Sequence, residues 1–97
     1  MSFSKVEEKA RSLLNLSTEE LHRRGIEALL EQELRPMEAE LFRLLMRYGI
    51  QDVFEMEALY QEGKLEEAQS WEDFFRIDHL TAQIKEIREL LETIRRT

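Results

Sequence analysis

Two stretches of the chain repeat apolar residues at alternating steps of three and four, the heptad spacing of helices that pack together. This spacing places each set along one side of an α-helix, where burial requires a second helix. The pattern therefore predicts two long helices that contact each other. The two ridges consist of Leu30, Leu34, Met37, Leu41, Leu44 and Tyr48, and of Ile77, Leu80, Ile84, Ile87, Leu91 and Ile94.

Composition favours an all-α fold. The 97 residues include 18 Glu and 15 Leu but only 2 Val, 3 Gly and 1 Pro, which disfavours strands and tight hairpins. We predict a single helical domain over residues 1–97, arranged as an antiparallel hairpin or bundle. The expected elements are a short helix 4–14, a long kinked helix 18–48, a short helix 53–62 and a long C-terminal helix 71–95. We expect N-terminal caps at Ser17, Asp52 and Ser70, and a left-handed Schellman ending at Gly49.

Pro36 lies inside the first ridge. It has no N–H and crowds the carbonyl of Gln32, so a straight helix would lose roughly 3 kcal/mol here. Because the ridge keeps its phase across Pro36, we favour one kinked helix. The alternative is two helices, with Pro36 in the first turn of the second.

Two helices cannot enclose an apolar ridge by themselves. The short helices are expected to cover part of it, and a second copy of the chain would cover the rest. We therefore expect a coiled-coil-like homodimer, with a tetramer as the open alternative.

The net charge of −7 is concentrated in one quarter of the chain. Residues 51–75 contain Lys64 as their one basic side chain against eight acidic ones. An acidic surface repels phosphate backbones and anionic lipid heads, which argues against nucleic acid or membrane as a direct partner. It favours a basic protein partner, and the alternative is a solvated acidic face.

The chain has no cysteine, which fits a reducing compartment and excludes disulfides and thiolate zinc sites. The first residues lack an apolar run of signal-peptide length. No stretch approaches the roughly 20 apolar residues of a membrane span. The expected location is the cytoplasm.

No motif specifies a reaction or a cofactor. Glu19 and His22 form the Glu-x-x-His half of a di-iron carboxylate site, but Arg76 stands where His79 would need its glutamate. We therefore predict no metal, no cofactor and no catalytic residue. The alternative from another functional class is a metal-dependent hydrolase with carboxylates from residues 19–40 and 72–86 inside a helical bundle.

Aromatic residues accompany the acidic segment. Phe74 is in phase with the second ridge and should be core, whereas Trp71 and Phe75 lie off it and are better candidates for contact with a partner. The predicted partner-contact residues are Glu66, Glu67, Trp71, Glu72, Asp73 and Phe75.

One further pattern is a helix ending in Tyr-Gly, a short helix, a Glu-Gly turn and an acidic-aromatic helix start. It consists of Tyr48-Gly49-Ile50, Phe54-Glu55, Glu62-Gly63-Lys64-Leu65 and Trp71-Glu72-Asp73-Phe74-Phe75. Over residues 41–92 this resembles small acidic helical antitoxin-like proteins of bacteria and archaea, many of them uncharacterised. The resemblance implies neutralisation of a basic ribonuclease. The chain departs from such proteins because it has no recognisable DNA-binding module and no evident disordered tail.

These observations predict a non-enzymatic module for protein–protein interaction, in which an acidic surface docks a basic partner. The alternatives are the metal-dependent hydrolase and a structural subunit of a larger assembly.

Overall fold

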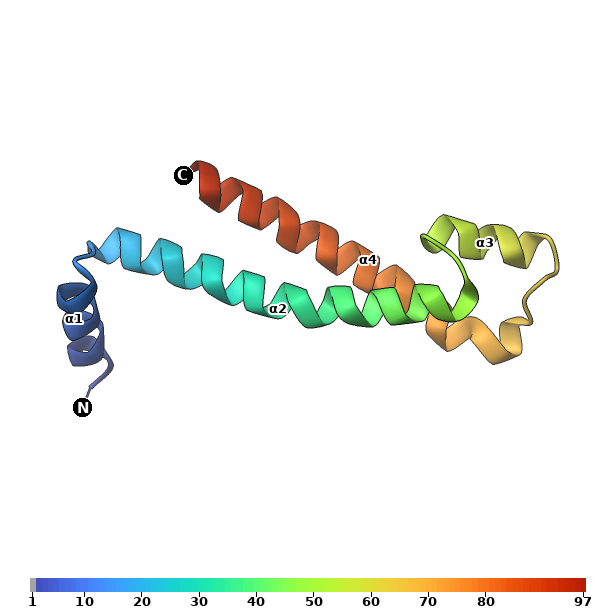
Figure 1. Cartoon of the computed structure of the whole chain (residues 1–97), viewed down its shortest axis with the longest axis horizontal. Helices are drawn as coiled ribbons and strands as arrows, with labels where there is room; N and C mark the ends of the chain where they lie inside the picture. Colours follow the sequence, from blue (N-terminus) through green and yellow to red (C-terminus); the bar gives the residue numbers. More distant parts are fainter. Residues whose placement is uncertain (1) are drawn as a thin grey trace.

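The computed structural model describes residues 2–97, which form helices and connecting turns and contain no strand. The all-α prediction is confirmed. Figure 1 shows α2 running along most of the molecule and α4 returning antiparallel beside it, with α3 at one end and α1 at the other. The helices are α1 (Phe3–Leu14), α2 (Thr18–Tyr48), α3 (Val53–Gln61) and α4 (Glu67–Arg96).

The molecule is long and thin. It measures 61 × 30 × 15 Å, and its radius of gyration is 19.6 Å. A compact chain of this length would have a radius of gyration of about 13 Å. Since a helix with side chains is about 10–12 Å across, the shortest dimension corresponds to one layer of helices. The hairpin therefore leaves both of its broad faces without a second layer.

Local sequence signals set most helix ends. The Ser17 hydroxyl accepts the Glu20 N–H at 3.0 Å and caps α2, as the sequence indicates. Asp52 accepts the Glu55 N–H at 2.9 Å and caps α3. Gly49 ends α2 in the left-handed conformation with φ 64°, and the N–H of buried Ile50 donates to the Leu45 carbonyl at 3.1 Å. This is the Schellman ending expected there.

The two ridges face each other but are not equally buried. Ile77 and Leu80 of α4 are fully buried, and Ile84 and Leu91 are nearly so. In α2 only Leu44 reaches that state, while Leu34, Met37 and the other ridge residues are half-buried. The core is continued at the α3 end by Ile50, Val53 and Met56. The difference arises because α4 packs against both α2 and α3, whereas α2 has α4 as its main neighbour.

Pro36 lies within one continuous helix. The α2 helix runs from Thr18 to Tyr48 without a break, so the prediction of a single helix through Pro36 is confirmed and the two-helix alternative is wrong. Figure 1 shows the gentle bend of α2. A bend at Pro36 is expected because its ring displaces the preceding turn.

The first and last helices begin earlier than predicted. The α1 helix begins at Phe3 with Ser2 as its cap, rather than at Ser4. The α4 helix begins at Glu67, whereas the prediction placed a cap at Ser70 and the start at Trp71. The Ser70 hydroxyl instead donates to the Glu66 carbonyl at 2.8 Å and lies 2.5 Å from the Tyr60 hydroxyl. With its oxygen used in this way, Ser70 does not cap, and the helix formers before it extend α4 by one turn.

Candidate functional site

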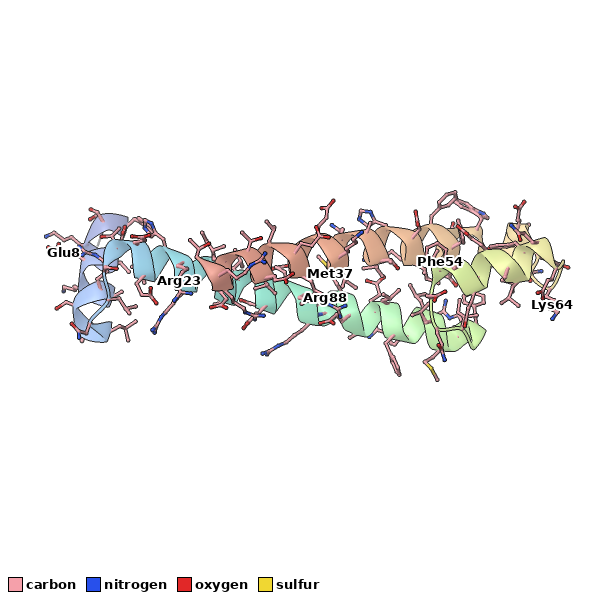
Figure 2. All side chains as sticks on the ribbon, turned by 90° about the horizontal axis from the view of Figure 1, so that it is seen from above. Glu8, Arg23, Met37, Phe54, Lys64 and Arg88 are labelled. Carbon is pink, nitrogen blue, oxygen red and sulfur yellow. The ribbon has the colours of Figure 1, made fainter. Side chains whose placement is uncertain are left out.

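The acidic segment 51–75 forms one end of the molecule, which we call the acidic tip. It contains α3, the turn after it and the first turns of α4. Figure 2 shows Phe54 and Lys64 at this end and Glu8 at the opposite end. The turn is closed by Gly63 at φ 72° and by the Lys64 N–H, which donates to the Leu59 carbonyl at 2.9 Å. The tip is therefore a structured helical corner.

A groove runs between α3 and the start of α4. Its open volume is about 690 Å³. The spacing of Glu67, Trp71 and Phe75 by four residues places all three on one face of α4. Trp71 is 49 % exposed and Phe75 is 60 % exposed. The groove is lined by Glu57, Tyr60, Gln61, Glu67, Ala68, Trp71, Phe74 and Phe75.

Four aromatic rings form a continuous row in this groove. The ring centroids of Tyr60 and Phe74 are 5.5 Å apart, those of Phe74 and Phe75 5.7 Å, and those of Phe75 and Trp71 5.9 Å. All three pairs meet edge to face, a favourable geometry for aromatic contacts. Phe74 packs against the core, as predicted, so the row connects the core to the exposed rings of Trp71 and Phe75.

The carboxylates of the tip are largely unneutralised. Among residues 2–97, no ion pair reaches Glu57, Glu66, Glu67 or Glu72. Lys64 pairs with Glu62 at 3.0 Å, outside the groove. The aromatic row is thus bordered by Glu57 and Glu67 without a compensating cation.

Asp73 differs from the other predicted contact residues. Its carboxylate accepts hydrogen bonds from Tyr48 Oη at 2.5 Å and from Arg47 Nη1 at 2.8 Å. These bonds lower the pKa of Asp73, the Tyr48 bond contributing most. Burial, followed by the hydrogen bond to Asp73, raises the pKa of Tyr48 to about 12. Asp73 therefore anchors α4 to the end of α2.

The remaining predicted residues lie on different faces of the tip. Glu67, Trp71 and Phe75 come together in the groove. Glu66 precedes the first turn of α4, and its backbone carbonyl accepts the Ser70 bond. Glu72 is exposed, one residue from Trp71 and so about 100° around the helix from it.

Sequence reasoning missed the α3 side of the groove. Glu57, Tyr60 and Gln61 line it, as does Ala68 on α4. The spacing of Glu57 and Gln61 by four residues could have indicated a shared helical face. Nothing local indicated that this face meets α4, because the contact depends on the bond between Tyr60 and Ser70 across the turn.

The polar pairs considered for chemistry are placed as follows. His22 Nε2 lies 3.1 Å from Glu7 Oε1, a contact between α1 and α2. Within residues 2–97, no group of three or more histidine, aspartate or glutamate side chains is arranged to hold a metal ion. In the same described part of the chain, no helix is both long and apolar enough to cross a membrane.

Fold and groove together define a thin all-helical hairpin protein with an aromatic groove at its acidic end. Comparison with known families is consistent with an uncharacterised class. The chain belongs to the uncharacterized protein MJ0235 family, whose model matches residues 1–97. No curated protein and no solved structure shows significant similarity to the chain.

Proposed function

We propose that this protein is a cytoplasmic, non-enzymatic interaction module that docks a basic protein partner at the groove of its acidic tip. The observation that carries this proposal is the row of aromatic rings between the unpaired carboxylates of Glu57 and Glu67. Exposed aromatics supply apolar contact area, and carboxylates beside them favour lysine or arginine on the partner.

The partner segment that fits this groove is amphipathic and cationic. An apolar side chain would contact Trp71 and Phe75, while lysine or arginine on the same segment would reach Glu57 and Glu67. Neutralisation of a basic ribonuclease is one form of this function, because such an enzyme has a cationic RNA-binding surface. A structural subunit that docks a basic neighbour is another form, which differs only in its partner.

Trp71 is the single tryptophan of the chain, so its fluorescence reports directly on the groove. The probe is a helical peptide of leucine and lysine, with a leucine and glutamate peptide as its control. We expect a blue shift of Trp71 emission with the lysine peptide and an affinity that falls with added salt. Equal binding of both peptides, or binding that ignores salt, would contradict the proposal.

Two variants locate the binding. Phe75→Ala should weaken peptide binding roughly 30-fold, the effect of losing an anchor of about 2 kcal/mol. Glu57→Gln with Glu67→Gln should weaken it roughly tenfold. Glu33→Gln is the control. It makes the same glutamate-to-glutamine change at an exposed position of α2 outside the tip, and it should leave affinity unchanged.

We also propose that the protein acts as a homodimer. The chain of 11.7 kDa exposes 7,555 Å². A compact monomer of this mass would expose about 5,900 Å². A standard interface covers about 800 Å² on each partner, so the excess is ample for a second copy. The dimer would cover part of the apolar surface that the thin hairpin leaves exposed.

A further inference from the structure

The end opposite the acidic tip carries the least covered apolar surface of the described chain. We call it the N-terminal corner: α1 together with residues 18–30 at the start of α2. None of residues 3–14 is buried. Phe3 is 82 % exposed, Leu13 85 % and Leu14 64 %, and on α2 Ile26 and Leu29 are more than half exposed. Phe3, Val6 and Ile26 line an open apolar groove between α1 and α2, and Leu13, Leu14 and Leu29 expose further apolar area at the same end of the molecule.

The α1 helix is nonetheless well formed. The Ser2 hydroxyl accepts the Lys5 N–H, and Asn15 closes the helix in the left-handed conformation with φ 56°. The Leu16 N–H then donates to the Arg11 carbonyl at 2.9 Å. An isolated helix of this length is marginal in water, and most helical stability in proteins comes from packing of the apolar face. Because α1 is nonetheless well formed, we expect its apolar face to pack against another protein surface.

The net charges of the two ends of the molecule indicate which surface packs against α1. Residues 2–30 contain five basic and five acidic side chains, so the N-terminal corner has no net charge. The acidic tip carries a net charge of −7. Two copies meeting at their tips would repel each other, whereas two copies meeting at their N-terminal corners would not.

We infer that the homodimer forms through the N-terminal corners, with α1 of each chain packed on the corner of the other. This inference rests on the dimer proposed above and adds the surface that forms it. A two-fold axis would bring the same apolar residues together from both chains. The two acidic tips would then lie at the far ends of the dimer, open to their partners.

The test compares oligomeric state between matched variants. Wild-type protein should sediment as a dimer, and Phe3→Asp with Leu13→Asp should weaken the dimer at least roughly 100-fold, because carboxylates would be buried in the interface. Phe42→Asp with Met46→Asp is the control: these side chains are also exposed, 64 % and 61 %, but lie in the last two turns of α2, outside the corner. The control should remain a dimer.

Because the chain has no cysteine, a single cysteine can be introduced at a chosen position. Leu13→Cys should form a disulfide-linked dimer on oxidation, and Phe42→Cys should not. Spin labels at Glu62→Cys should be farther apart than the 61 Å length of one chain. A wild-type monomer would overturn both the dimer and the corner. If the dimer persists in Phe3→Asp with Leu13→Asp, or dissociates in Phe42→Asp with Met46→Asp, the protein still dimerises but not through the N-terminal corner.

Discussion

The antiparallel pair of α2 and α4, which we call the shaft, and the acidic tip use their acidic residues in opposite ways. In the shaft, four glutamates of α2 pair with arginines of α4: Glu27 and Glu31 with Arg95, Glu38 with Arg88, and Glu40 with Arg76. In the tip, most carboxylates have no such partner among residues 2–97. The shaft uses charge to hold one helix in register with another. The tip leaves most of its carboxylates unpaired, where the proposed basic partner would contact them.

The same contrast applies to apolar residues. The α4 ridge is buried in the shaft, while Trp71 and Phe75 on an adjoining face of the same helix are exposed at the tip. One face of α4 therefore contributes to the core, and an adjoining face lines the groove. We therefore expect truncation of a buried apolar side chain to lower the free energy of unfolding far more than truncation of an exposed one.

The largest effect is expected from Leu80→Ala. Leu80 is fully buried in the shaft, and truncation of a buried leucine costs roughly 2–5 kcal/mol. Leu90→Ala makes the same chemical change on the same helix at a side chain that is 55 % exposed, and should cost far less. Urea unfolding followed by circular dichroism measures both. Similar losses for the two variants would mean that Leu90 is covered in the assembly.

A smaller effect is expected from Asp73→Asn, where shaft and tip meet. The hydrogen bonds from Tyr48 and Arg47 lower the folded-state pKa of Asp73 below its ordinary value of 3.8. The folded state therefore favours the carboxylate, and this stabilisation is present above pH 3.8 and lost as the pH falls below that value. We expect wild type to be more stable than Asp73→Asn near neutrality, with the two unfolding free energies converging in acid. Parallel curves across the whole pH range would contradict this account.

The charge contrast itself predicts changes of opposite sign. Glu40→Gln removes the negative charge and one of the two oxygens that accept hydrogen bonds from Arg76, each 2.6 Å long, and should lower the thermal midpoint by a few degrees at most. Glu67→Gln removes one of several like charges at the tip and should leave the midpoint unchanged or slightly higher. Both differences should shrink in high salt. A loss of stability with Glu67→Gln would show that this carboxylate has a partner.

Near neutral pH the smallest effect on stability is expected from the ionisation of Tyr48, which acts only in alkali. Burial and the hydrogen bond to Asp73 raise its pKa to about 12, against an ordinary value of 10.0. The unfolded chain loses this proton first, so unfolding becomes easier as the pH rises above 10. In Tyr60→Phe, ultraviolet absorbance follows the Tyr48 phenolate alone, because the chain has two tyrosines. Ionisation near pH 10 in the folded protein would show that Tyr48 is not held as described.

Much of the fold could be predicted because its signals are local. Ser17, Gly49 and Asp52 each act on backbone groups within a few residues, and the heptad spacing gives the facing sides of α2 and α4. The phase of the second ridge also separated half-buried Phe74 from exposed Trp71 and Phe75. Such signals do not depend on how distant parts of the chain meet.

The remainder depends on contacts between distant residues. The start of α4 was misplaced because Ser70 bonds to Tyr60, ten residues away, rather than capping the helix. Asp73 was grouped with the outward-facing acids, although Tyr48, 25 residues earlier, holds it in place. A serine at a cap and a serine across a turn look the same in a sequence. Only the folded chain distinguishes them.

The length of the shaft has a consequence for how binding strength can be built. The chain extends 61 Å, and a dimer joined at the N-terminal corners would hold its two grooves at opposite ends of a rod. A partner presenting one basic segment would occupy each groove independently and with equal affinity. A partner with two such segments would gain avidity only if its own spacing matched the rod, since a span that cannot be bridged contributes nothing. The helical rod would then act as a ruler that selects partners by their dimensions.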